Sequence, residues 1–444
     1  MDKTKMIALA AVAIIVVAAV AVVLVTNNSS SDDVQVKSDL RVFGNANGDY
    51  KIDSKDLDII EDYLKLTESE RAQKLIENPL ADADYDGVIT EADRDLVKKI
   101  INGESCTVYH YNTSNVKDYV VSTKWPIKSA LATGATNMLW MLTMAGVDDM
   151  IHGITYSASS SPDKTLFPRF SQMESIGSSS TKMPVDNASK WISQYGCTAI
   201  ISDKTESTID KATIEVQYEK MGVDIVRVGA ATVDVDEYCS QMFLLGFLFQ
   251  TTDECLDIAK WWIPFQEEID SKLAGVEKTK FITSNGTPGN KGIWISAGTS
   301  DYLDLCLVAG GESALDDSVL TDYSSGAYFK KTDGWLYKFD FDAIIHIKTG
   351  GWYSGTVDDA AKYSELDIFS ETQAYQEKGA YVMTGDAPVP VRIAYAAYLL
   401  HPDLFTEEWA NEKNKEYFEK FTDLDIDFSN LHFLITYDMV KGSS

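Results

Sequence analysis

The stretch TTDECLDIAKWWIPFQEEIDSKL (residues 251–273) lies near the middle of the chain and predicts one long helix. Thr251 followed by Glu254 fits a capping box, in which both side chains bind free backbone N–H groups of the first turn. About 20 helical residues extend roughly 30 Å, the diameter of a small domain. Pro264 removes one backbone donor, so we expect a kink or a break there. The stretch therefore predicts a helix long enough to join two domains.

Short β-rich segments alternate with helical stretches on both sides of this helix. The candidate strands before it are 119–125, 152–156, 199–203 and 224–229, and those after it are 280–285, 292–298, 343–350 and 380–385. Such alternation is typical of α/β units around a largely parallel sheet. We therefore predict an α/β fold with two Rossmann-like lobes, at 105–235 and 276–444, joined by connecting helices at 236–275.

Composition excludes one class of partner. The 444 residues carry a formal net charge of −29, with a pI near 4.5, so a nucleic-acid partner is not expected. The five cysteines are widely spaced and form no CxxC motif, which leaves zinc and thioredoxin-like sites without support. Most of them are expected to be small buried residues, although disulfides stay open.

Catalytic motifs are absent from the sequence. It contains no G-x-S-x-G, HExxH, Walker or GxGxxG motif. The five histidines are scattered, without an i, i+4 pair that would suit zinc. We therefore expect a protein that is not an enzyme and needs no catalytic cofactor.

The N-terminal region predicts export. Residues 6–25 are apolar and free of charge and proline, long enough to span a bilayer as a helix. Lys3 and Lys5 precede them and Asp32 and Asp33 follow, which places the bulk of the chain outside the membrane. We expect residues 1–35 to be an uncleaved transmembrane anchor with a linker, at the extracytoplasmic face of the cell membrane. The alternative is a cleaved signal peptide, whose apolar region is usually shorter.

Two twelve-residue runs, 45–56 and 82–93, have the pattern of calcium loops. Oxygen ligands recur at positions 1, 3, 5, 7, 9 and 12, the spacing that wraps several hard oxygens around one Ca²⁺ ion. The predicted ligands of the first loop are Asn45, Asn47, Asp49, the carbonyl of Lys51, Asp53 and Asp56. Those of the second loop are Asp82, Asp84, Asp86, the carbonyl of Val88, Thr90 and Asp93. Gly87 permits the sharp turn at position 6, where the first loop has Tyr50, so we expect the second site to be the stronger.

One amphipathic helix is predicted after each loop, at 57–66 and 94–103, and position 12 is Asp in both loops, where a calmodulin-type EF-hand has Glu. This duplicated loop–helix unit, residues 36–104, resembles a dockerin. The resemblance implies a small helical module that folds with calcium and binds a cohesin domain. Its cohesin contacts would fall at loop positions 10 and 11, which are Ser54 and Lys55 in one repeat and Glu91 and Ala92 in the other.

The larger part of the chain carries a second resemblance. The segment IKSALATGATNMLWMLTMAGVDDMIHGITY (127–156) is similar to the first strand–helix–strand of class III periplasmic binding proteins, which serve ABC importers of siderophores, haem and cobalamin. The segments 185–203, 292–313 and 334–352 resemble later parts of that family. The resemblance implies a ligand site between two lobes, lined by residues at strand ends. Carried over to this sequence, the ligand residues are Trp125, Tyr156, Trp352 and Tyr353, with Lys204, Arg392 and Arg169 as candidate cations.

Together these observations predict a surface-anchored solute-binding receptor that passes an iron chelate, haem or corrinoid to an ABC permease. A calcium-binding dockerin-like module would precede the receptor. Two alternatives stay open: an exported enzyme, or an adhesin, displayed on a cohesin scaffold. A nucleophile–base pair would favour the enzyme, and a space between the lobes filled by side chains would favour the adhesin.

Overall fold

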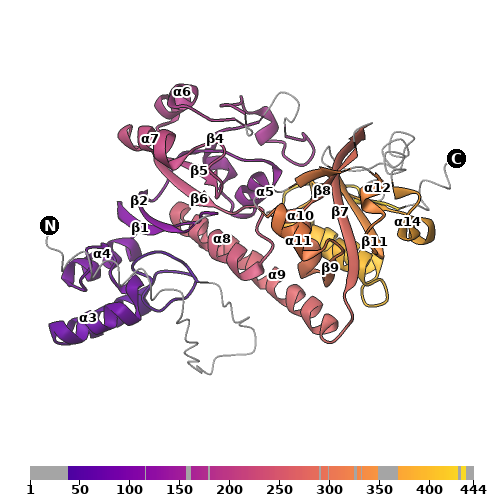
Figure 1. The fold of residues 1–444 in the computed structure, drawn as a ribbon. Coiled ribbons are helices and arrows are strands. Elements are labelled where there is room, and N and C mark those ends of the chain that lie inside the picture. Colours follow the sequence, from indigo (N-terminus) through magenta and orange to yellow (C-terminus); the bar gives the residue numbers. More distant parts are fainter. Residues whose placement is uncertain are drawn as a thin grey trace. The chain divides into compact units, whose positions relative to one another are not determined.

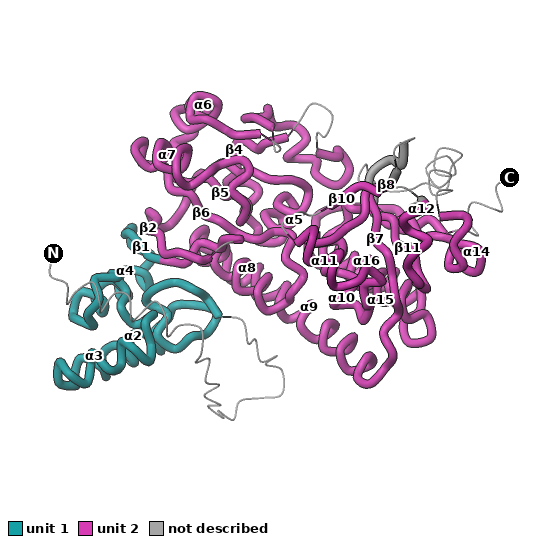
Figure 2. The backbone as a smooth tube through the Cα atoms, in the orientation of Figure 1, with its two compact units in different colours: residues 1–109 teal, residues 110–444 magenta. Residues whose placement is uncertain are grey.

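A computed structural model describes residues 39–115, 117–156, 162–178, 181–289, 292–298, 300–324, 328–331, 333–348, 369–428 and 432–436. The chain divides into two compact units, residues 1–109 and 110–444 (Figure 2). Among the described residues no helix is long and apolar enough to cross a membrane, and the predicted anchor at 6–25 lies outside them.

Unit 1 is a small helical module. Its helices are α2 (Ser54–Leu64), α3 (Glu68–Glu77), the short η1 (Pro79–Ala81) and α4 (Glu91–Ile101). Ile60 of α2 and Val97 of α4 are fully buried against Ile89. The predicted helix after each loop is present, and α3 is an additional helix between the two repeats. Strand β1 (Cys106–Asn112) carries the chain into unit 2.

The first lobe of unit 2 is built on a four-stranded parallel sheet in the order β4-β3-β5-β6. Its strands are β3 (Ala130–Ala132), β4 (Ile151–Ile154), β5 (Ala199–Asp203) and β6 (Asp224–Val228). The segment 119–125 does form a strand, β2 (Tyr119–Trp125), but β2 pairs with β1 in a separate two-stranded sheet. The central strand β3 was not predicted, because its sequence Ala-Leu-Ala has no β-branched or aromatic residue.

Helices of the first lobe connect the strands of its four-stranded sheet. They are α5 (Thr136–Met144), α6 (Val185–Tyr195) and α7 (Val216–Lys220), with short turns at η2 (Asp148–Met150), η3 (Phe170–Gln172) and the π-helical η4 (Lys211–Glu215). Helix α8 (Val235–Phe249) follows and is buried over most of its length.

The long helix predicted from residues 251–273 is α9 (Thr252–Leu273), which leads from α8 toward the second lobe (Figure 1). It is continuous through Pro264, so of the two expected outcomes the break is wrong and the kink stays a prediction. The predicted capping box was also wrong: the Thr251 side chain makes no cap hydrogen bond, and its hydroxyl is buried without a partner. Burial of Ile258, Trp262 and other apolar residues of α9 stabilises the helix instead.

The second lobe has a mixed sheet in the order β10-β8-β7-β11-β12-β13, with β9 beside β7. Its strands are β7 (Thr279–Gly289), β8 (Gly292–Ser296), β9 (Gly311–Ser313), β10 (Tyr328–Lys331), β11 (Ala343–Lys348), β12 (Tyr381–Thr384) and β13 (Leu434–Ile435). Strands β7, β11 and β12 are parallel, and β8 returns antiparallel to β7. The expected parallel sheet is therefore found in full only in the first lobe.

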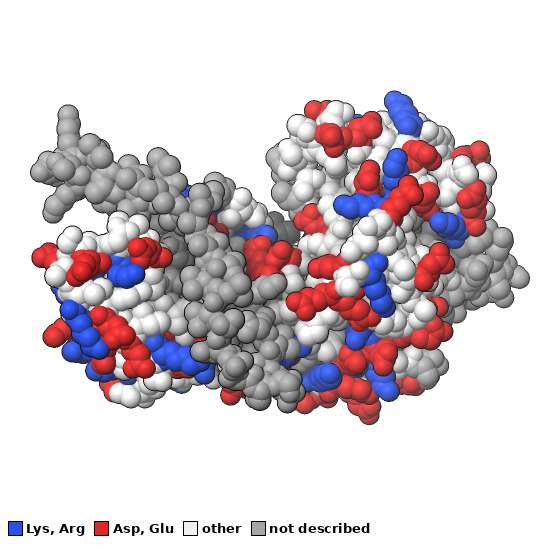
Figure 3. Space-filling model, turned by 90° about the horizontal axis from the view of Figure 1, so that it is seen from below, with Lys and Arg blue, Asp and Glu red and all other residues white. Residues whose placement is uncertain are grey.

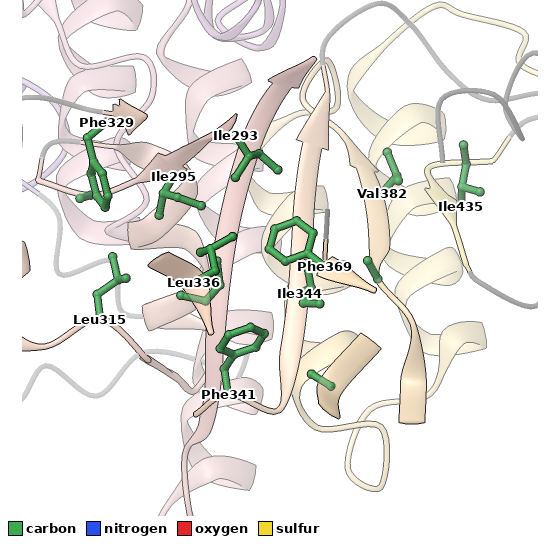
Figure 4. Packing of buried hydrophobic residues seen from close by; sticks show 14 residues of the cluster. Ile293, Ile295, Leu315, Phe329, Leu336, Phe341, Ile344, Phe369, Val382 and Ile435 are labelled. Carbon is green, nitrogen blue, oxygen red and sulfur yellow. The ribbon is translucent and has the colours of Figure 1, made fainter. Parts of the chain in front are cut away.

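Six described helices belong to this lobe: α10 (Asp301–Val308), α11 (Asp317–Asp322), α12 (Asp333–Leu336), α14 (Gln373–Lys378), α15 (Val389–Leu400) and α16 (Glu407–Phe421). One core cluster contains Ile293, Ile295, Leu336, Ile344 and Phe369, and Figure 4 shows these side chains gathered over the strands. Acidic side chains interspersed with Lys and Arg occupy much of the described surface seen in Figure 3, as a net charge of −29 requires.

Candidate ligand site and candidate calcium loops

Helix α5 of the first lobe contacts the second lobe through three side chains near its start. The indole Nε1 of Trp140 donates to the carbonyl oxygen of Asp386 at 2.7 Å, and the Thr136 hydroxyl donates to the Asp386 carboxylate at 3.3 Å. Asn137 Nδ2 donates to the Asp301 carboxylate at 3.4 Å. Asp301 and Asp386 lie at or just before the starts of α10 and α15, which follow β8 and β12. Polar groups from strand-end segments of both lobes therefore meet at α5.

Arg392 of α15 is the centre of this contact. Its side chain is only 1% exposed. Nη2 donates to Asn137 Oδ1 at 2.7 Å, Nη1 lies 3.3 Å from Asp301 Oδ2, and the guanidinium carbon lies 5.7 Å from the Tyr302 ring centre. A buried guanidinium needs such partners to offset its lost hydration. Arg392 was predicted to bind a ligand carboxylate, but the structure ties it to Asn137 and Asp301, so that role stays a prediction.

Lys204 lies directly after β5, as expected for a ligand residue. Its Nζ is 3.4 Å from the Thr232 hydroxyl. Burial raises the pKa of Asp203, beside it, and the charge of Asp301 in the other lobe raises it further. Burial and Asp301 also raise the pKa of Asp304, while Lys204 lowers it. Charged groups of the two lobes are thus close enough to affect one another.

Two tyrosines of the second lobe lie close together beside this contact. Tyr302 and Tyr328 have ring centres 6.1 Å apart. Burial raises the pKa of both phenols, that of Tyr328 to about 12, so both stay protonated hydrogen-bond donors at neutral pH. Sequence reasoning missed them, together with Asn137, Asp301, Asp304 and Asp386. The available signal was position: Asp301, Tyr302 and Asp386 all follow within six residues of a strand that was predicted, where ligands bind in open α/β sheets.

The structure does not bring the other predicted ligand residues into this group. Trp125 is 5% exposed, stacks on Phe247 at 5.4 Å, and donates its Nε1 proton to the Phe247 carbonyl at 2.7 Å. Arg169 binds the carbonyls of Asp148, Asp149 and Ile151, which lie at the start of β4 and not at its end.

Tyr156 does follow β4, but its hydroxyl donates to the Met173 carbonyl at 2.8 Å. Trp352 and Tyr353 lie outside the described residues. A ligand role for these five residues therefore stays a prediction, and the contacts of Trp125 and Arg169 explain both as structural.

The second calcium-type loop, 82–93, gathers three carboxylates. Oxygen atoms of Asp82, Asp84 and Asp86 all lie within 4.8 Å of one another. Burial, followed by the charges of Asp93 and Asp86, raises the pKa of Asp82 to about 6. Gly87 has φ +91°, the left-handed conformation that favours glycine at this turn. The residues fit a hard divalent cation such as Ca²⁺.

Asp93, at loop position 12, is fully buried and fixed by the backbone. It accepts from the N–H of Asp84 at 3.1 Å and from the N–H of Thr90 at 2.7 Å. Thr90 is the N-cap of α4 and Asp93 its third residue, so the pair forms a capping box. The other loop repeats this arrangement with Asp53 and Asp56.

The first loop, 45–56, differs in its charge. Lys51 Nζ lies 2.9 Å from Asp53 Oδ2, so the loop already contains a cation beside one predicted ligand. Asn45 donates to the carbonyls of Leu40 and Asp49, which leaves its buried Oδ1 without a partner and free to bind a metal. Tyr50, which stands where the second loop has Gly87, does not take a positive φ here; in the first loop the positive φ falls on Gly48.

The four predicted cohesin-contacting residues are exposed at the starts of two helices. Ser54 and Lys55 begin α2, and Glu91 and Ala92 begin α4. Their exposure leaves a docking role open but does not test it.

Comparison with known proteins gives matches by structure alone. No protein-family model matches the sequence, and no curated protein matches it, so the dockerin resemblance has no support from relatives. A TroA-like periplasmic binding protein, FepB from Veillonella parvula, matches with a TM-score of 0.59 and 13% identity over 73% of this chain and 99% of its own.

A periplasmic solute binding protein from the same organism matches with a TM-score of 0.54 and 18% identity over 72% and 95%. Helicobacter pylori CeuE with Ni(II) bound matches with a TM-score of 0.52 and 13% identity over 75% and 99%. The first two are described as binding proteins, in agreement with the expectation that this chain is not an enzyme. At these identities the likeness establishes the fold: the larger unit has the two-lobed α/β fold of periplasmic binding proteins.

Proposed function

We propose that the chain is an extracytoplasmic solute receptor of an ABC importer, which holds its ligand noncovalently between the two lobes and delivers it to a permease. The proposal rests on one observation above all: charged and aromatic residues from strand-end segments of both lobes meet where α5 contacts α10 and α15. In open α/β sheets this is where ligands bind. The ligand class that we propose is an iron chelate, haem or corrinoid.

The charges of the described residues narrow that class. Within the described part of the chain, the carboxyl groups of Asp203, Asp301, Asp304 and Asp386 lie in this region together with two cationic side chains, Lys204 and Arg392. A highly anionic chelate would be repelled by such a site. The arrangement favours a neutral or cationic metal complex, or a flat macrocycle that packs on Tyr302 and Tyr328.

The test is direct. The chain from residue 36 onward is purified from its native host, and absorbance spectra and elemental analysis of bound metal reveal any retained chelate. Tryptophan fluorescence is then titrated with haemin, cyanocobalamin and ferric citrate, since all nine tryptophans lie in unit 2. Lys204→Met is expected to weaken binding. The matched control Lys190→Met removes an exposed lysine that pairs with Glu174, and it should bind as the wild type does.

No retained chromophore or metal, together with flat titrations for all three compounds, would refute the proposed ligand class. Equal effects of Lys204→Met and Lys190→Met would refute the proposed site.

We also propose that unit 1 binds Ca²⁺, more tightly at 82–93 than at 45–56. The close carboxylates of Asp82, Asp84 and Asp86 support the first site, and the unpartnered Oδ1 of Asn45 supports the second. Bound Ca²⁺ would offset the repulsion among these groups and fix the turns that precede α2 and α4. Calorimetric titration of residues 36–109 with CaCl₂ should show two binding events of unequal affinity; no binding heat would refute both sites.

Docking to a cohesin domain through Ser54, Lys55, Glu91 and Ala92 remains the further function that we propose for this unit, alongside its attachment to the membrane through residues 6–25. A pull-down with a purified cohesin in CaCl₂ and in EGTA tests it. Calcium-independent capture, or none, would count against it.

A further inference from the structure

Arg227 occupies an unusual position for an arginine. It lies in β6 inside the first lobe, and its side chain is 1% exposed. Its backbone is held at the same time, because its N–H donates to Asn112 Oδ1 at 2.9 Å. No part of this side chain reaches solvent for a ligand to contact, so any role toward the ligand site must act through other residues.

The guanidinium binds the segment that follows β5. Nη1 donates to the carbonyls of Asp203 and Thr205 at 3.4 and 3.3 Å, and Nη2 donates to the carbonyl of Ile209 at 2.7 Å. These three carbonyls belong to residues 203–209, which leave the sheet at the end of β5 and carry Lys204. An irregular segment at a sheet edge has backbone acceptors without strand partners. One side chain supplies donors to three of them.

The two remaining donors of the guanidinium fix its own position. Nη2 also lies 2.5 Å from Glu215 Oε2, and Nε donates to the Tyr119 hydroxyl at 2.9 Å. Tyr119 in turn donates to Glu215 Oε1 at 3.2 Å. An arginine has five N–H donors, and here each has an acceptor. A charge buried to this extent is tolerated only with such complete pairing, so the guanidinium has one allowed orientation.

Lys204 is held from a second direction. Its N–H donates to the carbonyl of Val228, the residue after Arg227, at 2.9 Å. Its side chain passes over Gly229, where an added Cβ would lie 3.0 Å from Lys204 Cδ and 2.6 Å from the Thr232 hydroxyl. Because Gly229 has no side chain, the Lys204 side chain can cross it and reach Thr232.

We propose that Arg227 is a positioning residue for the ligand site: it holds residues 203–209 so that Asp203 and Lys204 are presented in one fixed arrangement before ligand arrives. The inference rests on the proposed function for its meaning, but the positioning itself is a property of the ligand-free protein. Pre-organisation of this kind reduces the conformational entropy that binding would otherwise cost.

The experiment measures hydrogen–deuterium exchange of the ligand-free full chain. Arg227→Lys keeps the charge but loses the fork that reaches three carbonyls, and it should speed exchange in residues 203–209 by about tenfold or more. Tyr119→Phe removes one acceptor and should give a smaller effect in the same segment. Ile225→Val is the control, since it trims the core of the same strand without touching this network. The labelling rate of the Lys204 amine by an acylating reagent is followed in parallel.

Localised faster exchange at 203–209 with faster Lys204 labelling, in both network variants and not in the control, supports the inference. Exchange that is unchanged in Tyr119→Phe, or that rises equally throughout the lobe in all three variants, overturns it. Haemin titration of the same variants then separates the two proposals. Flat titrations with a localised exchange effect would count against the ligand class while leaving Arg227 as a positioning residue.

Discussion

Replacing Asp82 by asparagine (Asp82→Asn) should change the stability of unit 1 in opposite directions with and without calcium. The pKa of Asp82 is raised from 3.8 to about 6, chiefly by burial and then by the charges of Asp93 and Asp86. A carboxyl group whose pKa is higher in the folded state stabilises the fold while protonated. That contribution is lost as pH rises from about 4 to about 6. At pH 7 the ionised Asp82 therefore destabilises the calcium-free fold.

The magnitude follows from the shift. Two pKa units correspond to about 3 kcal/mol. The neutral amide of the variant would avoid this cost, but it has one acceptor oxygen where the carboxylate has two. The N–H groups of Gly87 and Asp86 lie 2.9 and 3.1 Å from different oxygens of Asp82, so in the variant one N–H keeps a weaker acceptor and the other loses its acceptor. Together these changes cost about 2 kcal/mol, so the calcium-free variant should gain about 1 kcal/mol at pH 7. In a module of this size that raises the melting temperature by roughly 4–8 °C.

With calcium the order should reverse. Wild-type protein at a calcium concentration about 100 times its Kd gains about 2.7 kcal/mol, and loss of one anionic ligand removes most of that gain. Thermal unfolding of residues 36–109 by circular dichroism, at pH 7 in EGTA and in CaCl₂, measures both effects. Asp58→Asn, an exposed position of α2 outside the loop ligands, is the control. A variant that melts below wild type in EGTA, or that calcium stabilises as much as wild type, would refute the reasoning.

Three further outcomes are expected. Lys51→Met should raise calcium affinity at 45–56 severalfold by freeing Asp53, since Lys51 is predicted to bind only through its carbonyl; an unchanged calorimetric titration would show that the ion pair is irrelevant. His110, whose pKa burial lowers to about 4, stays neutral in the fold while the unfolded chain takes up a proton near pH 6.5. Unit 2 should therefore lose about 2–3 kcal/mol between pH 7.5 and 4.5, seen as an earlier urea midpoint in tryptophan fluorescence, and His110→Gln should flatten that slope. Asp301→Asn should destabilise unit 2 by about 3 kcal/mol or more, because it leaves Arg392 buried without a counterion. Asn137→Ala, which removes a neutral hydrogen-bond partner, should cost about 1–2 kcal/mol. Equal urea midpoints for the two variants would contradict the role of Asp301 as the counterion of Arg392.

The two units differ in how far the sequence predicts them, for a physical reason. In unit 1 all the predicted ligands of one loop lie within twelve consecutive residues. Loop positions 9 and 12 are also the N-cap and the third residue of the helix that follows. Ligand spacing and helix capping are both local, so the sequence shows them together. The Lys51–Asp53 ion pair and the additional helix α3 were not predicted and needed the structure.

In unit 2 most strands were predicted within a few residues, but β3, β9, β10 and β13 were not, and of these β3 bears on the candidate site. Its three residues Ala130–Ala132 form the middle of the sheet through pairing with β4 and β5, which no local propensity reveals. Local propensity favours β2 over β3 as the first strand of the first lobe's sheet. That prediction places Trp125, at the end of β2, in the ligand site. The helix that follows β3 carries Asn137, so the same error hid the first lobe's contribution. The contacts of Asn137 with Asp301 and Arg392 join residues more than 160 positions apart.

The contacts of the arginines in unit 2 bear on the charge of the ligand. Unit 2 contains three arginines, Arg169, Arg227 and Arg392, and each donates to protein groups. Arginine is the side chain best suited to binding carboxylates and phosphates in a bidentate manner. A receptor for a highly anionic chelate would place that chemistry in its site, whereas here Arg169 and Arg227 serve the fold and Arg392 is already paired with Asn137 and Asp301. We therefore propose a ligand that carries little negative charge and is recognised through its shape, through contact with Tyr302 and Tyr328, and by Lys204.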